Sequence, residues 1–315
     1  MITIKASAKI NLFLDVLDKR RDGYHNIQSL LLPISLHDTI RIKSHSGTIC
    51  SVIPAACRFP GIPWSFSMGA NNENLVNRAA TLFKKTTGCR KGARIILTKR
   101  IPIGAGLGGG SADAAAVLIG LNRLWRTGLS PKELMEIGAQ IGSDVPALIH
   151  GGTICMEGRG ETITPVNGLV GRDAPILLVY PGFAISTGDI YRRYDRHRKE
   201  SRPKPPPRSK FHSVMAGLKR GSTEVIDQGL FNALEETVFR KYPLLEMIKN
   251  NLEKAGAKHV LLTGSGSTVF VLLKEWSEGE KTAKLIRERT GSPLWTKVVH
   301  AIGQHNQSGL QTAGV

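Results

Sequence analysis

A glycine-rich stretch between Arg100 and Trp125 holds the residues whose types and spacing most directly suggest chemistry. Five glycines occur within the seven residues 104–110, and a run of small and apolar residues follows them. Glycine lets the backbone approach a ligand closely and turn its amides toward it. The start of a helix adds unpaired N–H groups and a positive dipole end. A glycine loop in front of a helix is therefore typical of a phosphate-binding site.

Two well-known phosphate-binding patterns fit this stretch only in part. Gly104, Gly106 and Gly109 satisfy GxGxxG, but a dinucleotide-binding fold also needs an acidic residue about twenty positions further on, and none occurs there. The P-loop pattern fails because Gly110 stands where the phosphate-binding lysine belongs. A second interpretation stays open, in which the glycines only allow a strand and a helix to pack closely.

Three polar residues outside the glycine loop are the next candidates for chemistry. Alternation of apolar and polar residues over positions 4–15 predicts a strand, and it puts Lys9 and Asn11 side by side on one face. Most lysines of this kind are solvated, so the position of Lys9 alone assigns it no role. Asp144 precedes a Val-Pro pair, which favours a helix N-cap. A carboxylate at that point can also serve as a general base.

The elements that must position these residues are strands and helices in the first half of the chain. An Asp-Gly turn at 22–23 should connect the first strand to a returning strand and a further strand within 26–44. Residues 93–102 read as a strand that stops at a proline. Helices are expected over residues 75–88, 112–125 and 130–142. The first has capping residues before Leu75, Asn74 among them, and the second and third have Ser111 and Ser130 as N-cap.

The second half of the chain alternates helices and strands as well. Turn residues cluster over 161–175, where we place the boundary between an N-terminal domain (1–165) and a C-terminal domain (166–305). The short link inside residues 259–274 favours antiparallel pairing and hence an α/β sandwich. Residues 306–315 should form a flexible tail. The strands and helices expected in this half are 175–182 (strand), 231–242 (helix), 244–255 (helix), 259–274 (two strands), then a helix, and 294–302 (strand).

The formal net charge of +18 could reflect nucleic acid, anionic lipid or phosphate-rich substrates. The densest basic run, 191–210, holds four of the 16 prolines within residues 203–207. We therefore expect a solvated loop or linker there, a basic Pro-rich insertion over about 192–210. Aromatic residues are only 6%, and no helix-turn-helix, zinc-finger or aromatic-interleaved ribonucleoprotein pattern occurs, so nucleic acid is not the expected partner.

Composition narrows the class of protein further. Hydrophobic residues make up 41% and charged residues 22%, which suits a chain with a buried core. No apolar run reaches the roughly 18 to 20 residues of a membrane span, and the start carries no signal-peptide pattern. The four cysteines are scattered without metal-binding spacing, which favours free thiols in a reducing compartment. We expect a cytoplasmic protein without a membrane partner; its oligomeric state stays open.

The glycine stretch is also the strongest family signal. "IPIGAGLGGGSADAAAVLIGLN" resembles the central motif, P-x-G-x-G-L-G-S/G-S/G-S/A-A, of the galactokinase–homoserine kinase–mevalonate kinase (GHMP) superfamily. "AKINLFL", "DGYH", "IGSDVPALIHGGTICMEGRGETITPV" and "LLTGSGSTVF" resemble further blocks, in the expected order, of a branch that phosphorylates a cytidine diphosphate derivative. The resemblance implies an α+β, two-domain fold. A ribosomal-protein-S5-like α/β domain would precede a ferredoxin-like α/β sandwich, with the active site in the cleft between them.

The resemblance also implies roles for individual residues in an ATP- and Mg²⁺-dependent phosphorylation of an alcohol. Asp144 would act as the base, Lys9 would assist it, and Asn11 could bind the same hydroxyl. Tyr24 and Tyr191 would stack on cytosine. The ATP-binding residues it implies are Pro102, Ile103, Gly104, Ala105, Gly106, Leu107, Gly108, Gly109, Gly110, Ser111, Ala112, Asn74, Leu75 and Lys99; Ser111 is also a possible Mg²⁺ ligand, and His25 and Thr187 complete the substrate site.

Two alternatives to this function remain at this point. Another small-molecule kinase of the superfamily, acting on mevalonate, homoserine or a sugar, would share the glycine loop but would not need Tyr24, His25 and Tyr191 as a base-binding set. A non-catalytic nucleic-acid-binding relative would account for the charge. Leu31 is a departure, since the resembling branch often carries an aromatic residue there, on one wall of the substrate pocket.

Overall fold

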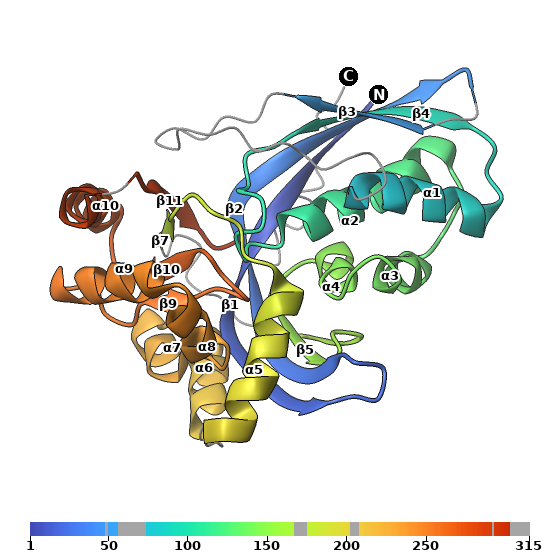
Figure 1. Ribbon diagram of the computed structural model, residues 1–315. Coiled ribbons are helices and arrows are strands. Elements are labelled where there is room, and N and C mark those ends of the chain that lie inside the picture. Colours follow the sequence, from blue (N-terminus) through green and yellow to red (C-terminus); the bar gives the residue numbers. More distant parts are fainter. Residues whose placement is uncertain (48–49, 56–73, 167–174, 202–207, 292, 303–315) are drawn as a thin grey trace.

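A long β-hairpin runs through the whole molecule and takes part in both of its halves (Figure 1). The computed structural model describes residues 1–47, 50–55, 74–166, 175–201, 208–291 and 293–302 of the 315-residue chain. The hairpin consists of β1 (Ile2–Lys19) and β2 (His25–His45), joined by the expected Asp-Gly turn. The sequence predicted two strands in the returning segment; it is one strand of 21 residues, bent by irregular pairing instead of a break.

β1 is buried on both faces over residues 8–14, and its pairing with β2 is irregular in the same region. The pairing with β2 slips between Ser7 and Lys9 and again between Asn11 and Phe13. A bulge of this kind bends a strand and redirects its side chains. The alternation predicted Lys9, Asn11 and Phe13 to be on the polar face; they are buried because distant parts of the chain cover that face, as Leu107 does at Lys9 and Thr263 at Asn11.

The first sheet has seven strands in the order β3-β4-β2-β1-β8, with β5 and β6 attached beside β2. β8 comes from the second half of the chain and pairs in parallel with β1. The expected division at about residue 165 therefore does not separate the strands of this sheet. The remaining strands of the sheet are β3 (Cys50–Ala55), β4 (Gly92–Thr98), β5 (Ile154–Gly158), β6 (Thr162–Pro165) and β8 (Phe231–Asn232).

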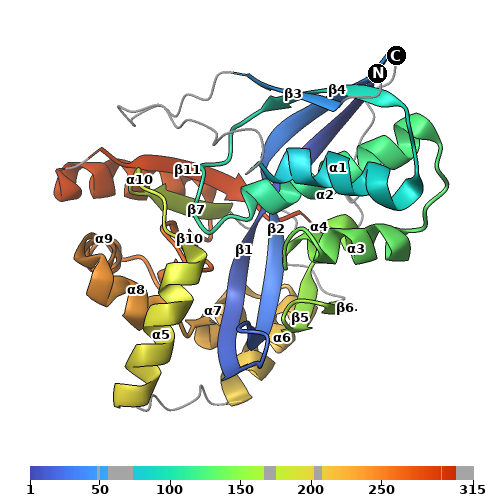
Figure 2. The same ribbon diagram turned by 45° about the vertical axis from the view of Figure 1, so that its right-hand side comes forward.

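Four helices pack beside the first sheet, α1 (Leu75–Thr87), α2 (Gly109–Trp125), α3 (Pro131–Ala139) and α4 (Val145–His150) (Figure 2). The predicted caps of two of them are confirmed. Asn74 Oδ1 accepts a hydrogen bond from Val76 N, and Ser130 forms a capping box with Glu133. α2 is buried nearly all round, as its small residues predicted.

The second sheet confirms the expected sandwich. Its order is β11-β7-β10-β9, and every neighbouring pair is antiparallel. Taken in chain order, this is the β-α-β-β-α-β arrangement of a ferredoxin-like fold. Its strands are β7 (Pro175–Tyr180), β9 (Leu261–Leu262), β10 (Val269–Leu272) and β11 (Trp295–His300). Its helices are α5 (Thr187–Ser201), α6 (Arg208–Arg220), α7 (Thr223–Gly229), α8 (Glu235–Lys241), α9 (Pro243–Lys254) and α10 (Trp276–Thr290).

The basic run at 191–210 is not the loop that the sequence predicted. Its first part continues α5 to Ser201, and its last part begins α6 at Arg208. The prolines that motivated the prediction lie between these helices, and they fall outside the described residues, as does the expected tail at 306–315. Basic residues of α5 have structural partners: the Arg198 guanidinium donates to the carbonyl oxygen of Val16 at 3.1 Å.

The two halves share one buried core. Ile10 and Leu32 from the hairpin belong to the same cluster as Ile176 and Leu178 of β7. Apolar burial of this kind stabilises the contact between the sheets and holds the hairpin in place. Within the described parts of the chain, no helix is long and apolar enough to cross a membrane.

Candidate active site

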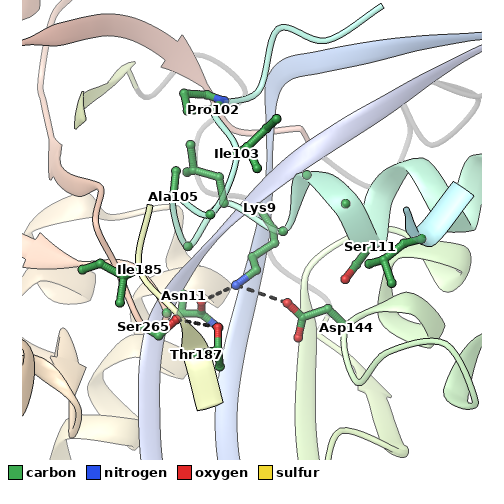
Figure 3. A pocket seen from close by; sticks show the side chains of 18 of the residues that line it. Lys9, Asn11, Pro102, Ile103, Ala105, Ser111, Asp144, Ile185, Thr187 and Ser265 are labelled. Atoms are coloured by element: carbon green, nitrogen blue, oxygen red, sulfur yellow. Dashed lines mark hydrogen bonds and ion pairs between the residues drawn. The ribbon is translucent and has the colours of Figure 1, made fainter. Parts of the chain in front are cut away.

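A cavity of about 530 Å³ lies beside the glycine loop, and both halves of the chain contribute to its lining (Figure 3). Most of the residues implied by the resemblance meet there. Those that line it are Lys9, Asn11, Asn74, Leu75, Lys99, Pro102, Ile103, Gly104, Ala105, Gly106, Leu107, Gly108, Gly109, Gly110, Ser111, Asp144, Thr187 and Tyr191. Three other expected residues, Ala112, Tyr24 and His25, are described but are not part of this lining.

The glycine loop delivers a bare helix N-terminus to the cavity. Gly104, Gly106 and Gly108 have φ angles of 63°, 77° and 68°, a conformation that favours glycine. α2 begins at Gly109 and is capped by Gly108, so the prediction that Ser111 caps it is wrong. The Ser111 hydroxyl instead lies in the first turn of the helix and lines the cavity. With no side-chain cap, the first amides of α2 are left for an anionic ligand.

Close packing is a second reason for glycine in this loop, and it involves the other half of the chain. A Cβ on Gly106 would lie 2.2 Å from the carbonyl oxygen of Thr263, and one on Gly104 would lie 2.5 Å from Ala184 Cβ. Ile185 N donates to Gly104 O at 2.9 Å and fixes the same contact. Close packing thus requires glycine at positions 104 and 106, but the neighbour is the second half of the chain and not the strand–helix contact of the alternative interpretation.

Asp144 and Lys9 form an ion pair at the cavity. Lys9 Nζ lies 3.4 Å from Asp144 Oδ2, and Figure 3 shows the two groups pointing toward each other. Asp144 holds the N-cap position of α4, but its side chain makes no capping hydrogen bond to this described helix. The carboxylate is therefore directed at the cavity, where its side chain is 30% exposed, against 6% for Lys9.

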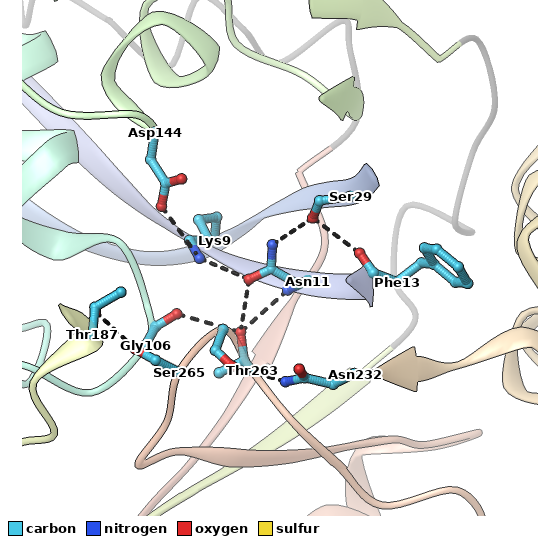
Figure 4. A network of polar contacts seen from close by, with 11 residues as sticks. Lys9, Asn11, Phe13, Ser29, Gly106, Asp144, Thr187, Asn232, Thr263 and Ser265 are labelled. Carbon is cyan, nitrogen blue, oxygen red and sulfur yellow. Dashed lines mark hydrogen bonds and ion pairs between the residues drawn. The ribbon is translucent and has the colours of Figure 1, made fainter. Parts of the chain in front are cut away.

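A chain of hydrogen bonds holds the Lys9 ammonium in place (Figure 4). Lys9 Nζ donates to Asn11 Oδ1 at 2.7 Å, and Asn11 Nδ2 donates to Ser29 Oγ at 2.8 Å. Ser29 Oγ in turn donates to Phe13 O at 2.9 Å. From the second half of the chain, Thr263 Oγ1 accepts from Asn11 N at 3.2 Å. Asn11 is thus committed through both ends of its amide group, and its contact with Lys9 orients the cation.

Lys99 belongs to a buried cluster that the sequence did not indicate. Its Nζ donates to Asp113 Oδ2 at 2.8 Å and to Asp38 Oδ2. Asp38 also accepts from the backbone amides of Arg100 and Ile101. We call Lys99, Asp38 and Asp113 the buried cluster. The one available signal was Asp113, a lone carboxylate in an otherwise small and apolar helix.

Burial perturbs the acidities within the buried cluster. Burial alone would lower the pKa of Lys99, but the carboxylates of Asp113 and Asp38 outweigh it and raise that pKa. For Asp113, burial is the largest influence and raises its pKa to about 8, against the lowering effect of Lys99. Asp113 Oδ1 has no hydrogen-bond partner among the described residues. These values indicate that Asp113 carries a proton over part of the neutral range.

Tyr191 and Thr187 of α5 also line the cavity. Thr187 Oγ1 lies 2.8 Å from Ser265 Oγ. This contact joins the start of α5 to the loop between β9 and β10, which contains Gly264 and Gly266. Burial, and after it the nearby Asp144 carboxylate, raises the pKa of the Tyr191 hydroxyl, which stays protonated. Tyr191 therefore offers a neutral aromatic ring near the Lys9–Asp144 ion pair.

Two residues that were expected at the substrate pocket, Tyr24 and Leu31, do not line the cavity. Tyr24 is 53% exposed in the turn before β2, with the Arg159 guanidinium 4.7 Å from its ring centroid. Leu31 is buried with Ala147, Ile154 and Met156, and it is not part of the cavity lining. The expectation that Leu31 forms a wall of this pocket is wrong because the side chain faces α4 and β5.

The described residues do not supply a metal site of their own. No group of three or more His, Cys, Asp or Glu side chains that could hold a metal ion occurs in them. Of the oxygen-bearing side chains in the cavity lining, Asp113 is bonded to Lys99 and Asp144 is paired with Lys9, which leaves the Ser111 hydroxyl in the first turn of α2. This donor set fits a Mg²⁺ ion that is bound mainly by nucleotide phosphates, which is the usual arrangement for Mg²⁺ at phosphoryl-transfer sites.

The fold and the cavity are those of a GHMP-type small-molecule kinase. The family model described as GHMP kinases N terminal domain matches residues 74–152, and the model described as GHMP kinases C terminal matches residues 214–289. A solved homoserine kinase from Cytophaga hutchinsonii shares the fold, with a TM-score of 0.69 over 96% of this chain and 95% of its own, at 17% identity.

More similar proteins narrow the class to one family. A 4-diphosphocytidyl-2-C-methyl-D-erythritol kinase of Pelotomaculum thermopropionicum is 40% identical over 94% of this chain and 98% of its own length. The enzyme of the same name from Thermodesulfovibrio yellowstonii is 39% identical over 96% and 98%. A crystal structure of 4-(cytidine 5'-diphospho)-2C-methyl-D-erythritol kinase superposes with a TM-score of 0.74 at 30% identity, over 95% of this chain and 99% of that one. The chain belongs to the 4-diphosphocytidyl-2-C-methyl-D-erythritol kinase family, and it is an ATP-using enzyme.

Proposed function

We propose that this chain transfers the γ-phosphate of ATP to the 2-hydroxyl group of 4-diphosphocytidyl-2-C-methyl-D-erythritol, a step of the non-mevalonate route to isoprenoid precursors. The observation that carries the proposal is the Lys9–Asp144 ion pair, which faces the same cavity as the glycine loop. The choice of acceptor follows the names of the relatives that are 40% and 39% identical to the chain.

The nucleotide would be bound chiefly by backbone groups. Amides of residues 106–111 and the positive end of α2 bind the β- and γ-phosphates. Lys99 supports this loop through the buried cluster, because it immediately precedes the loop and is joined to Asp113 just beyond it. Asn74 and Leu75, which line the same cavity, lie at the nucleoside end. We assign ATP binding and catalysis mainly to residues 1–165 and the acceptor side to residues 166–305.

Residues at the N-terminus of α2 would also meet the metal ion. The Ser111 hydroxyl contributes one oxygen, and the nucleotide phosphates contribute the others. Bound Mg²⁺ supplies neutralisation of the negative charge on the phosphates. Asp144 stays free of the metal in this proposal, because its carboxylate is engaged by Lys9.

The transfer step would use Asp144 and Lys9 on the acceptor hydroxyl. Asp144 accepts the proton of the hydroxyl as its oxygen attacks the γ-phosphorus. A loose transition state demands little deprotonation before attack, so an ordinary carboxylate suffices. The Lys9 ammonium, 3.4 Å from Asp144 Oδ2, would stabilise negative charge on the transferring group. Asn11, bonded to Lys9 at 2.7 Å, fixes that cation.

The cytosine ring would lie against Tyr191, and its edge would be read by His25. Aromatic stacking accepts any base, so discrimination has to come from hydrogen bonds at the base edge. Thr187, at the start of α5, contacts the diphosphate or sugar side. Tyr24 would cover the other face of the base from the turn before β2.

The proposal is tested by supplying three acceptors separately. The chain is incubated with ATP and Mg²⁺ plus the diphosphocytidyl acceptor, mevalonate or homoserine, and ADP release is followed together with the ³¹P spectrum of the product. Only the diphosphocytidyl acceptor should be phosphorylated. ADP release with mevalonate or homoserine alone would assign the chain to another kinase activity. Turnover with none of them, together with salt-sensitive binding to DNA, would support a non-catalytic nucleic-acid-binding protein.

A further inference from the structure

The carboxylate of Asp195 binds two residues of the central hairpin at once. His25 Nε2 lies 2.6 Å from Asp195 Oδ1, and Lys19 Nζ donates to Asp195 Oδ2 at 2.6 Å. Lys19 and His25 are themselves paired where β1 ends and β2 begins. One side chain of α5 therefore bridges both strands of the hairpin next to the proposed cytosine site. The sequence resemblance assigned no role to Asp195.

We propose that Asp195 is a positioning residue for the cytosine base of the substrate, and that it acts by fixing the orientation and the tautomer of the His25 imidazole. This inference rests on the proposed function, which places a cytosine ring beside Tyr191. Asp195 is a carboxylate held by two donors, and the His25 side chain is only 6% exposed, so the imidazole has little room to turn. An ionised carboxylate can only accept a hydrogen bond.

The consequence is a defined hydrogen-bonding character at the other ring nitrogen. Because Asp195 accepts from Nε2–H, a neutral His25 carries its proton on Nε2 and leaves Nδ1 as an acceptor. No residue in the described part of the chain forms a hydrogen bond with Nδ1. As a hydrogen-bond acceptor, Nδ1 can bind the exocyclic amino group that cytosine carries at C4. It repels the carbonyl oxygen that uracil carries at the same position, because both atoms are acceptors.

The position of His25 relative to Tyr191 supports this arrangement. The ring centroids lie 5.0 Å apart with an interplanar angle of 35°, which is an offset contact. Tyr191 lines the cavity, whereas His25 and Asp195 line a neighbouring surface pocket, so the His25–Tyr191 contact connects the two. A base that lies beside the imidazole, on the part of the same Tyr191 face that this offset contact leaves free, would meet His25 edge to edge. Asp195, behind the imidazole, sets which edge it presents.

Burial and charge agree with a positioning role for Asp195. Burial would raise the pKa of its carboxyl group, but hydrogen bonds from Lys19 and His25 outweigh this and lower that pKa, so the group stays ionised. Lys19 is 53% exposed and reaches the carboxylate from solvent. It fixes the rotation of the carboxylate, and its removal should have a smaller effect than that of Asp195.

The experiment compares Asp195→Ala and Asp195→Asn with the unmodified chain. Binding of cytidine diphosphate and of uridine diphosphate is measured by calorimetry with a non-hydrolysable ATP analogue present, and KM values are measured for the diphosphocytidyl acceptor and for ATP. Asp195→Ala should weaken cytidine diphosphate binding about tenfold and reduce its advantage over uridine diphosphate. Asp195→Asn should shift the preference toward uridine diphosphate, because its amide can donate to Nε2 and move the proton to Nδ1. The KM for ATP should not change.

Controls separate this role from simple loosening of the structure. Asp18→Asn removes an exposed carboxylate from the surface pocket that Asp195 and His25 also line. Asp18 accepts hydrogen bonds from Asn26 and not from His25, so this variant should leave the cytidine preference intact. An unchanged ratio of cytidine to uridine affinities in both Asp195 variants would overturn the inference. So would equal weakening of both nucleotides with a lowered Tm. If the unmodified chain lacks turnover yet shows a cytidine preference that depends on Asp195, the proposed function fails and this inference stands.

Discussion

The molecule contains two lysine–carboxylate sites within reach of the glycine loop, and they differ in nearly every physical respect. In the first, which we call the open pair, Lys9 Nζ and Asp144 Oδ2 are 3.4 Å apart and the Asp144 side chain is 30% exposed. In the buried cluster, Lys99 lies between two carboxylates, at 2.8 Å from Asp113, and all three side chains are at most 4% exposed. The residue types are the same, but only the open pair leaves a charged oxygen that a substrate can reach.

The difference shows what burial makes of an ion pair. Removing charges from water is costly, and it is offset only where the geometry is close and further hydrogen bonds are made. The buried cluster meets this condition through the amides of Arg100 and Ile101, and it joins β2, the start of the loop and α2. The open pair makes fewer contacts, and its carboxylate keeps the ability to accept a proton. One site is suited to hold the loop and the other to do chemistry on what the loop binds.

The largest effect should come from neutralising the open pair. Asp144→Asn keeps the shape of the side chain but removes the base, so kcat should fall by about 10³- to 10⁴-fold, while the affinity for ATP and the Tm change little. Turnover is measured by ADP release and nucleotide affinity by calorimetry. Near-normal turnover in this variant would remove Asp144 from its proposed role.

Replacing Lys99 should affect folding more than chemistry. Lys99→Met removes the buried cation that binds the carboxyl groups of Asp38 and Asp113, so the free energy of unfolding should drop by about 3 kcal/mol or more. Urea unfolding measures this drop. Lys9→Met is the matched control: it should impair turnover strongly and stability much less, because Asp144 can be hydrated through the cavity. Equal losses of stability in the two variants would erase the contrast between the open pair and the buried cluster.

Local patterns in the sequence predicted much of this architecture. Capping residues and apolar periodicity located the helices that start near Asn74 and Ser130, and these depend only on neighbours a few positions away. The glycine loop could be found because positive φ angles and a bare helix N-terminus require glycine. Lys9 and Asp144 could be named only through the family resemblance, since a lone strand lysine and a lone capping aspartate carry no such signal.

Features that depend on distant partners were not predicted. Asp38 and Lys99 are 61 positions apart, and nothing in either neighbourhood reports their contact. The face of β1 that alternation predicted to be polar is covered by residues far along the chain, such as Thr263 at Asn11. The sequence did not predict that the two ends of the basic run belong to α5 and α6. Tertiary contacts such as Lys19–Asp195 hold α5 in place, and the composition of the segment does not report them.

The smallest predicted effect concerns the pH dependence of the buried cluster. Burial raises the pKa of folded Asp113 to about 8, above the ordinary value of 3.8 that applies to the unfolded chain. A raised carboxyl pKa gives stability that is fully present below the unfolded value and is lost as the pH rises through the folded value. Asp113→Asn cannot titrate, so its free energy of unfolding should fall less than that of the unmodified chain between pH 6 and 8, by about 1–2 kcal/mol. Urea unfolding at pH 6, 7 and 8 measures the difference.

Asp22→Asn is the control, since Asp22 has a lowered pKa and titrates only in acid. Parallel stability curves for Asp113→Asn and the unmodified chain would show that Asp113 is ionised throughout, and that both carboxylates share Lys99 as charged groups.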